Sequence, residues 1–537
     1  MSSHVDGHMM KAFEMRVRSH GISDVLRLAA SKVPGKLALV YRHCRYSYAE
    51  LDAAVNTMAN ALCARGVRRG DRIALLSHNN DGYVIAYFSL ARLGAISVPV
   101  NFMLNASEIA YILRHCGASG VVAEDRLVET AEAAIAQSGA SVVLRGAILD
   151  HYSQVPPGWE SIAEWLAHPD ATLPDVLVSD DDPIQIMYTS GTESRPKGAT
   201  LSSRSYMAQY ISCIVNGEMS GDDVSVHCLP LYHCAQLHCF LTPGIYLGST
   251  NIILGAPDPQ AILAAVEEQR ATSLFCPPTV WIALLGQLRL QQRDLSSLKK
   301  GYYGASIMPT EIVKELLHAL PGLRLFNFYG QTEMAPLATV LSPQDQLRKL
   351  GSAGRPAINV QTRIVDDADQ PVPSGTIGEI VHRSPHLMLG YWNDPETTAA
   401  AFRGDWFHSG DLGVMDEEGY LRVVDRKKDM IKSGGENVAS REVEEVLYSN
   451  PAVSEAAVFG LPDPLWIEAV TAAVVLREGA RIDESALMDF CRERLAGFKT
   501  PKRIAFVERL PKNASGKILK RELRLQFVSE ASWRVIA

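Results

Sequence analysis

The stretch that decides the fold is "MYTSGTESRPKGATLSS", residues 187–203. An apolar run that ends at Met187 opens into a segment rich in Ser, Thr and Gly, followed by Pro196-Lys197-Gly198. Unhindered backbone N–H groups, hydroxyls and one positive charge suit a polyphosphate, although a plain surface loop is the alternative. A P-loop would need Lys directly followed by Ser or Thr. The stretch therefore predicts a strand ending in a phosphate-binding loop that is not the common P-loop.

Composition places the chain among globular enzymes. It has 537 residues, of which 47% are hydrophobic and 21% charged, so we expect about two to four domains. A formal net charge of -8 argues against nucleic acid as the main partner. The start lacks the apolar core of a secretory signal, and the longest apolar region, 83–104, is interrupted by Arg92, Gly94 and Pro99. We therefore expect a cytoplasmic protein without an integral membrane segment.

The chain has nine cysteines and no C-x-x-C pair, which fits free thiols in a reducing compartment. The segment "LYHCAQLHCF", 231–240, gathers His233, Cys234, His238 and Cys239. These are zinc-ligand types, but no second ligand pair of recognisable spacing occurs elsewhere and the flanks are apolar. Buried cysteines acting as small hydrophobes are the favoured interpretation, and a metal site is the alternative.

Short β-rich apolar runs alternate with helix-period runs over most of the chain. The β-rich runs include 72–77, 120–125, 250–255, 273–278 and 323–330, and helical spacing recurs at 259–270 and 310–320. The alternation predicts an α/β fold with largely parallel sheets and ligands at the carboxyl ends of the strands. Region 83–104 reads as a buried helix ending near Leu93-Gly94, followed by a buried strand from Ala95 to Val100.

The pattern changes after about residue 355. Strict alternation with Pro and Gly turns predicts a small antiparallel β-subdomain. Beyond the charged cluster Asp425–Asp429, "SREVEEVLYSN" predicts a helix with a serine cap, followed by two strands and a last helix. We place a domain boundary at the charged cluster, for which a solvated surface turn is the alternative.

Three further segments carry side chains suited to nucleotide chemistry. "NFYGQTEMAP", 327–336, brings Glu333 to the end of an apolar strand, where it can bind Mg²⁺ or start a helix. "DWFHSGDLG", 405–413, holds Asp411, which can accept ribose hydroxyls or serve a turn. "LPKNASGKILKREL", 510–523, presents Lys517 after Ser-Gly in a basic stretch, which alone reads as a solvated face.

Together these segments resemble the adenylate-forming superfamily of acyl-CoA synthetases, firefly luciferases and peptide-synthetase adenylation domains. The matching motifs, in the superfamily's order, are "YTSGTESRPKG", "YGQTE", "WFHSGDLG", "DRKKDMIKSGGENV" and "PKNASGKILKREL". The resemblance runs from about residue 41 to the C-terminal Lys motif, and the joint match is highly specific. "LPLYHCAQL", "GYYGASIMP" and "GGENV" are most similar to acyl-CoA synthetases.

The resemblance implies a large N-terminal domain, 1–425, made of two αβ subdomains and a small β-subdomain. It also implies a hinge, 426–429, with Lys428 at the hinge position, and a small mobile α+β C-terminal domain, 430–537. The implied reaction joins a small-molecule carboxylic acid to coenzyme A with ATP and Mg²⁺. An acyl-adenylate and pyrophosphate form first, and the thiol then displaces AMP.

The resemblance also assigns roles residue by residue. Lys517, Thr332, Glu333 and His233 would act in catalysis, and Glu333 and Thr189 would hold the metal. The ATP or AMP site would comprise Thr189, Ser190, Gly191, Thr192, Ser194, Lys197, Gly304, Ala305, Ser306, Asn327, Phe328, Tyr329, Gly330, Gln331, Asp411 and Arg426. The acyl pocket would comprise His233, Tyr302, Ala305, Met308, Met334 and Val280, and the coenzyme A tunnel Ser433, Gly434 and Gly435.

Several functions stay open at this point. A medium- or long-chain fatty acid is our first expectation for the acid, and an aromatic acid is the second, because the expected pocket is apolar. A second carboxylate is disfavoured because the pocket stretches contain no Arg or Lys. A ligase that loads a carrier protein and a degenerate ATP-binding regulator are the alternatives, although a pure binder has no need of Lys517. A homodimer is compatible with the sequence.

Overall fold

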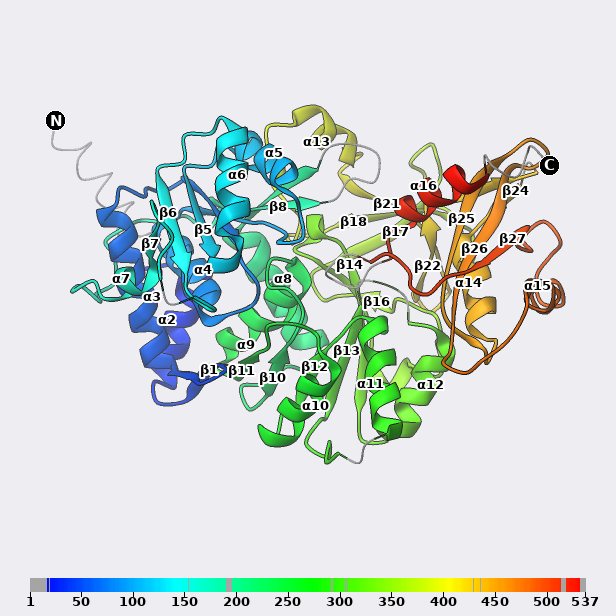
Figure 1. The fold of residues 1–537 in the computed structure, drawn as a ribbon, viewed down its shortest axis with the longest axis horizontal. Coiled ribbons are helices and arrows are strands. Elements are labelled where there is room, and N and C mark those ends of the chain that lie inside the picture. Colours follow the sequence, from blue (N-terminus) through cyan, green and yellow to red (C-terminus); the bar gives the residue numbers. More distant parts are fainter. Residues whose placement is uncertain are drawn as a thin grey trace.

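The computed structural model describes residues 17–18, 20–152, 154–189, 196–290, 293–304, 306, 308–427, 429–434, 436–512 and 518–531. Two large sheets form the N-terminal part (Figure 1). The strands of the first sheet, in spatial order, are β16 (Arg355–Pro356), β15 (Leu337–Leu341), β14 (Arg324–Gly330), β13 (Lys300–Gly304), β12 (Ser273–Phe275), β10 (Val224–His227), β11 (Thr250–Ile253), β1 (Leu37–Tyr41) and β2 (Cys44–Ser47). Those of the second are β19 (Gly390–Tyr391), β9 (Lys197–Ser202), β8 (Pro183–Thr189), β4 (Ile96–Pro99), β3 (Arg72–Leu76), β5 (Gly120–Glu124), β6 (Leu144–Ile148) and β7 (Glu160–Ser161).

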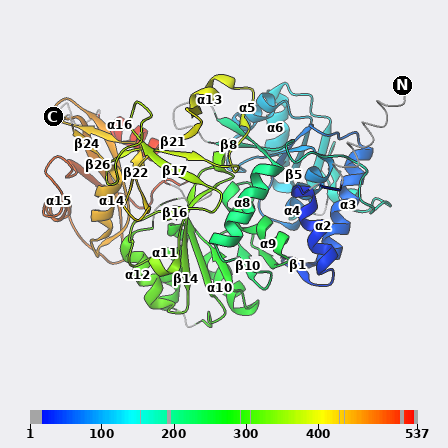
Figure 2. The same cartoon turned by 180° about the vertical axis from the view of Figure 1, so that it is seen from behind.

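Two smaller sheets complete the molecule, and the C-terminal one lies at the end opposite the N-terminus (Figures 1 and 2). The third sheet contains β17 (Gln361–Val365), β18 (Gly378–Arg383), β21 (Trp406–Met415), β20 (Phe402–Arg403) and β22 (Leu421–Arg426). The C-terminal sheet contains β24 (Glu436–Val438), β23 (Ile431–Ser433), β26 (Ile467–Leu476), β25 (Val453–Asp463) and β27 (Arg503–Phe506).

Helices connect most of the parallel strands. In the N-terminal part they are α2 (Ile22–Lys32), α3 (Tyr48–Ala64), α4 (Asp81–Leu93), α5 (Ala106–Cys116), η1 (Asp125–Leu127), α6 (Val128–Ser138), α7 (Ile162–Leu166), α8 (Ser203–Asn216), η2 (Ala235–Leu241), α9 (Thr242–Leu247), α10 (Pro259–Glu268), α11 (Pro278–Leu290), α12 (Thr310–Ala319), η3 (Thr332–Met334), η4 (Pro343–Asp345) and α13 (Pro395–Ala401). The C-terminal unit has α14 (Ser440–Tyr448), α15 (Glu484–Arg492) and α16 (Lys520–Ala531). The α/β prediction is confirmed, since β3, β4, β5 and β6 pair in parallel, as do β10 to β14.

Helix α4 shows why the apolar run 83–104 is not a membrane span. Asn80 caps its first turn by accepting the N–H of Tyr83, and Gly94 ends it in the left-handed conformation. Its residues from Gly82 to Leu93 are all buried, because α4 packs on α2 and α3 within the core shared by the two large sheets. The predicted helix end and the following strand, β4, are confirmed. Within the part of the chain that the structure describes, no helix has the length and apolarity needed to cross a bilayer.

One local prediction is wrong. Ser440 does not cap α14, because the cap position is Ala439 and Ser440 is the first helical residue. Its N–H and its hydroxyl both donate to the Oδ2 atom of Asp425, at 2.7 Å each. The serine therefore connects the C-terminal unit to the charged cluster instead of accepting an N–H group from the first turn of its own helix. The proposed hinge residue Lys428 lies outside the described residues, so the domain boundary at this cluster stays a prediction.

Several histidines are buried in the fold. Burial lowers the pKa of His227 and of His386 to about 4 and that of His382 to about 3. His386 donates from Nδ1 to the carbonyl of Leu337 and accepts the hydroxyl of Ser212 at Nε2, so the neutral ring is the form that fits.

We expect the free energy of unfolding to fall as the pH drops from about 6.5 towards 4. In that window the histidines of the unfolded chain take up protons, whereas the buried rings of the folded protein do not. This difference lowers the free energy of unfolding by about 2 kcal/mol per histidine at pH 5. In urea denaturation, a His386→Gln variant should therefore lose less stability between pH 7 and pH 5 than the parent. His318→Gln, which removes an exposed imidazole, is the control. Equal losses in parent and His386→Gln would contradict the expectation.

Candidate functional site

The phosphate-loop stretch is a β-hairpin. Strand β8 pairs antiparallel with β9, and Thr189 lies opposite Lys197, with the Thr189 hydroxyl 3.5 Å from the carbonyl oxygen of Lys197. The hairpin thus fixes both ends of the predicted loop. Ser190, Gly191, Thr192 and Ser194 lie outside the described residues, and their phosphate contacts stay predictions.

Strand β14 delivers the second motif to the same region. Gly330 must be glycine, because a Cβ there would lie 1.8 Å from the carbonyl oxygen of Pro336. Its neighbour Gln331 has a buried Nε2 atom without a hydrogen-bond partner in the described structure. An amide donor left unpaired in the interior is costly, so a ligand acceptor at this position would be favourable.

The residues predicted to border the adenine lie at the ends of β13 and β14. Gly304 lets the two strands approach, since a Cβ there would lie 2.3 Å from the carbonyl oxygen of Phe328. Asn327 donates to the carbonyl of Ser352 at 3.1 Å. Ser306 is exposed, whereas Ala305 lies outside the described residues.

Asp411 forms the most completely defined part of the site. Its Oδ2 atom accepts the hydroxyl of Tyr329 at 2.7 Å, and its Oδ1 atom lies 3.2 Å from Nε of Arg426. Burial lowers the pKa of Arg426, but the charges of Asp411, Tyr329 and Glu333 outweigh it and leave that pKa raised. The Oδ1 atom is buried and has no hydrogen bond within the described residues. A ribose hydroxyl would supply the missing donor.

Tyr391 joins two predicted site residues that come from different sheets. Its hydroxyl donates to Oε1 of Glu333 at 2.9 Å, and the Nζ atom of Lys197 lies 5.3 Å from the centre of its ring. The backbone of Glu333 is also fixed, because its carbonyl accepts the N–H of Met388 at 2.9 Å. Lys197 and Glu333 therefore meet at one phenol, and Arg426, which lies beside Asp411, is close enough to Glu333 for that carboxylate to raise its pKa.

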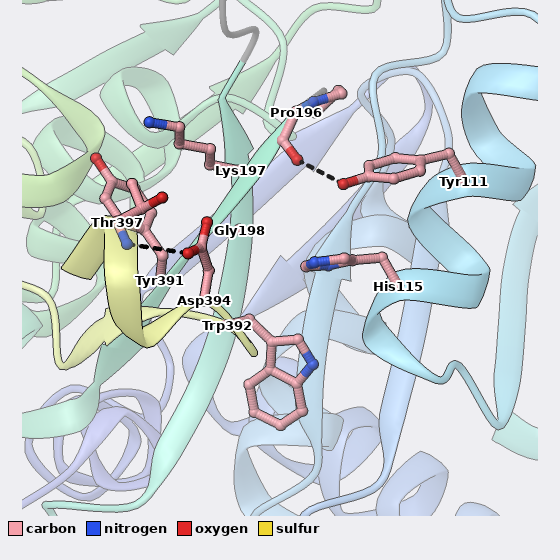
Figure 3. A pocket seen from close by; sticks show the side chains of 9 residues that line it. All are labelled: Tyr111, His115, Pro196, Lys197, Gly198, Tyr391, Trp392, Asp394 and Thr397. Atoms are coloured by element: carbon pink, nitrogen blue, oxygen red, sulfur yellow. Dashed lines mark hydrogen bonds between the residues drawn. The ribbon is translucent and has the colours of Figure 1, made fainter. Parts of the chain in front are cut away.

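A cavity of about 310 Å³ lies beside Lys197, between α5 and the segment that carries Tyr391 (Figure 3). His115 and Tyr111 line one wall, where the Tyr111 hydroxyl lies 3.3 Å from the carbonyl oxygen of Pro196. Burial lowers the pKa of His115, whose Nδ1 atom is 2.7 Å from the hydroxyl of Tyr188. The cavity thus borders the end of the phosphate-loop hairpin.

The His233 segment meets the nucleotide motif at Cys234, whose Sγ atom is 3.4 Å from the hydroxyl of Thr332. His233 accepts the N–H of Ala235 at Nδ1, at 3.2 Å, so a neutral ring carries its proton on Nε2. The π-helix η2 follows directly, and helices of this kind are frequent at functional sites.

The structure favours buried thiols over a zinc site in this segment. Burial raises the pKa of Cys234 to about 12 and that of Cys239 well above its usual value. His238 is bound elsewhere, with Nδ1 2.7 Å from the hydroxyl of Tyr210 and Nε2 2.6 Å from Oε1 of Gln185. Among the described residues every one of the nine cysteines is a free thiol.

The expected acyl-pocket residues differ in their surroundings. Met308, Met334 and Tyr302 are buried, and Val280 is partly buried. The hydroxyl of Tyr302 donates to the carbonyl of Gly217 at 2.7 Å, and its ring stacks on Phe326. A contact between these side chains and an acyl group stays a prediction.

Two of the predicted coenzyme A residues, Ser433 and Gly434, lie at the end of β23, the strand between β24 and β26. Gly434 has a φ of +62° and donates its N–H to the carbonyl of Trp466 at 2.8 Å. Ser433 is buried, and its hydroxyl has no partner among the described residues. Gly435 and the catalytic candidate Lys517 lie outside the described residues, so the structure does not test the approach of Lys517 to the site.

The residues present fit a magnesium nucleotide. The unpaired Oδ1 atom of Asp411 suits a ribose, the unpaired amide of Gln331 suits a base or phosphate oxygen, and Glu333 supplies the carboxylate that Mg²⁺ prefers. Sequence reasoning missed Tyr391. The only sequence signal is a Gly390-Tyr391-Trp392 run before a turn at Asn393-Asp394-Pro395, which does not show that the phenol contacts Glu333.

Comparison with known proteins gives a consistent result. The family model described as "AMP-binding enzyme" matches residues 26–392, and the "AMP-binding enzyme C-terminal domain" matches residues 442–517. A feruloyl-CoA synthase from Amycolatopsis sp. is 39% identical over 95% of this chain and 100% of its own length. A long-chain-fatty-acid–CoA ligase from Mycobacterium tuberculosis is 34% identical over 90% of this chain and 93% of its own. The crystal structure of the anthranilate CoA ligase AuaEII with anthranoyl-AMP has a TM-score of 0.88 and 28% identity, covering 95% of this chain and 98% of that one.

We expect Asp411→Ala to weaken AMP binding about 10- to 100-fold, because hydrogen bonds to a charged group contribute about 1.5–3 kcal/mol each. Isothermal titration calorimetry with AMP measures the change. Asp367→Ala is the matched control, since its carboxylate is 94% exposed on the same small β-subdomain. The expectation fails if both variants bind AMP as the parent does.

Proposed function

The chain belongs to the AMP-binding enzyme family, and from that premise we propose that it activates an apolar monocarboxylic acid carrying an aromatic ring and transfers the acyl group to coenzyme A. At the coarser level it is an AMP-forming acid–thiol ligase of the acyl- and aryl-CoA ligases, which use ATP, Mg²⁺ and coenzyme A. The observation that carries the proposal is the convergence of Lys197, Glu333 and Asp411 around Tyr329, Tyr391 and Arg426.

The chemistry proceeds in two displacements. First, a carboxylate oxygen attacks the α-phosphorus of ATP, the bond from that phosphorus to the bridging oxygen breaks, and pyrophosphate leaves. Second, the coenzyme A thiolate attacks the acyl carbon and expels AMP. Two anions must meet in the first step, so positioned cationic groups and N–H donors are the main source of acceleration.

We assign this chain's residues to those steps as follows. Lys197 and the hairpin loop bind the outer phosphates, and Asp411, supported by Tyr329 and Arg426, binds the ribose hydroxyls. Glu333 and Thr189 would hold Mg²⁺, which when bound supplies positive charge between phosphate oxygens. Thr332 lies by the α-phosphate, and Lys517 bridges the α-phosphate and the carboxylate. Ser433, Gly434 and Gly435 would line the pantetheine path after the C-terminal unit turns at Lys428.

The similarity to a feruloyl-CoA synthase and to an anthranilate CoA ligase supports an aromatic acid as the first candidate. This reverses the order expected from the sequence alone, which put fatty acids first. A fatty acid is the second candidate, supported by the similarity to a long-chain-fatty-acid–CoA ligase. The described acyl-pocket residues contain no Arg or Lys to pair with a second carboxylate. A carrier-protein acceptor is the alternative to coenzyme A, and a cytoplasmic location and a homodimer stay predictions.

The test is product analysis over a panel of cinnamic, benzoic, medium-chain and long-chain acids, each with and without coenzyme A. We expect AMP and pyrophosphate with every accepted acid, and thioester only when coenzyme A is present. The highest kcat/KM should belong to an acid that carries an aromatic ring. ADP formation would contradict the reaction, and a strong preference for unbranched fatty acids would contradict the aromatic assignment alone.

We expect Lys517→Ala to slow adenylation by about 10²–10³-fold, as the loss of one charge-stabilising donor typically does. Thioester formation from supplied acyl-adenylate should remain within a few-fold of the parent, because the lysine acts only in the first step. Single-turnover assays of each half-reaction separate the two. Lys512→Ala is the control, since Lys512 pairs with Glu455 within its own domain at 2.7 Å. Equal damage to both half-reactions would refute the role of Lys517.

A further inference from the structure

The side chain of Asn79 connects the two large sheets through three hydrogen bonds. It follows β3 of the second sheet and is 3% exposed. Its Nδ2 atom donates to the carbonyls of Leu229, at 2.8 Å, and Leu254, at 3.0 Å, and its Oδ1 atom accepts the N–H of Leu231 at 2.7 Å. All three partners are backbone groups that follow β10 and β11 of the first sheet. One side chain therefore fixes the segment that leads into His233.

The segment that carries Asn79 is itself rigidly held. Glu124 is fully buried at the end of β5. Its Oε2 atom accepts the backbone N–H of His78 at 2.8 Å and lies 2.9 Å from the Nδ1 atom of the His78 ring. Burial would raise the pKa of Glu124, but the bonds from His78 and Arg126 lower it to about 2. The carboxylate stays ionised, so the backbone next to Asn79 remains anchored at neutral pH.

Glu124 could instead indicate a metal site, because Glu124, Asp125 and His151 offer ligand atoms close together. The hydrogen bonds argue against this interpretation. Oδ2 of Asp125 already accepts the N–H groups of Asp150, His151 and Tyr152, at 2.7–2.9 Å, and both oxygens of Glu124 accept protein donors. These hydrogen bonds brace the loops.

Two further contacts reach the segment 229–233 from the side of the second sheet. One is the T-shaped contact of Phe102, which follows β4, with Tyr232, whose ring centroids are 5.4 Å apart. The hydroxyl of Tyr83 lies 3.3 Å from the carbonyl oxygen of Leu231, a weaker bond from the same side. Gln236 of the π-helix η2 also accepts the N–H of Leu229 at 3.2 Å, but this contact is local, because Gln236 lies only seven residues further along the chain. Immediately beyond, His233 donates its N–H to the carbonyl of Pro230 at 3.1 Å. The position of the imidazole therefore follows the position of Leu229–Leu231.

We propose that Asn79 is a positioning residue for the acid site, because it sets the place of His233 and Cys234 relative to Thr332 without touching the substrate. The inference rests on the proposed function, in which His233 borders the acyl group and the thiol entrance. A displacement of about 1 Å at a positioned group can cost about 10²-fold in rate. The nucleotide contacts of Lys197 and Asp411 come from other segments and should not depend on Asn79.

The first experiment compares Asn79→Ala with the parent in steady-state kinetics. We expect the KM for the acid to rise about tenfold or more and the KM for ATP to stay within twofold. Asn56→Ala is the matched control, because Asn56 is a buried asparagine of the same subdomain whose side chain accepts from Arg92 and not from the His233 segment. Tyr83→Phe removes the weaker hydrogen bond to the carbonyl of Leu231 and should raise the KM for the acid by about twofold. An equal rise of both KM values, or the same pattern in Asn56→Ala, would overturn the proposal.

A double-mutant cycle tests whether Asn79 acts through His233. We expect Asn79→Ala to have little further effect on the acid KM in a His233→Ala background, because neighbouring residues that act as a unit are not additive. Fully additive effects would refute the coupling.

Hydrogen exchange separates this inference from the proposed function. The amide of Leu231 should exchange at least tenfold faster in Asn79→Ala than in Asn56→Ala, whatever reaction the parent performs. If that amide is deprotected but the parent forms no thioester from any acid, the proposed function fails and the anchoring stands. If the amide keeps its protection, the anchoring itself is wrong.

Discussion

Tyr391 keeps apart two opposite charges that would otherwise neutralise each other. Lys197 lies over its ring and Glu333 accepts its hydroxyl, so the ammonium and the carboxylate are held on one phenol without an ion pair between them. A direct pair in a half-buried site would satisfy both groups and leave neither for a ligand. Because the two side chains come from β9 and from the turn after β14, this phenol also ties together the ends of the two large sheets. A site for a polyanion and a cation depends on this separation.

A similar arrangement occurs at Asp411, the predicted ribose-binding residue. Asp411 is buried with one oxygen bound by Tyr329 and the other beside Arg426 but without a hydrogen bond, so its charge is compensated while one acceptor remains. A wholly satisfied carboxylate would serve the fold alone, and a wholly unpaired one would destabilise it or become protonated. Asp411 lies between these two cases, so its carboxylate can stabilise the fold and still offer one oxygen to a ligand.

Much of this arrangement could be predicted from the sequence, since strands, helices and the ends of strands follow from local periodicity and from Gly and Asn at helix ends. The adjacent pair Asn79-Asn80 shows the limit. Asparagine is a common helix-cap residue, yet only Asn80 caps α4, whereas Asn79 bonds backbone groups of the other sheet. Ser440 likewise reads as a cap but bonds Asp425, and Tyr391 reads as a turn aromatic. In each case a partner far away in the chain decides the role, and no local pattern records that partner.

The tight crossing at Gly330 has a bearing on how such a chain could be adapted to new acids. No side chain larger than hydrogen fits against Pro336 there, so the turn that presents Thr332 and Glu333 tolerates no substitution at that point without moving the strand. Laboratory evolution of acid preference should thus leave Gly330 unchanged and alter residues that are predicted to line the acyl pocket, such as Val280 on α11. The turn at Gly330 would then keep its backbone geometry while the side chains around the bound acid are exchanged.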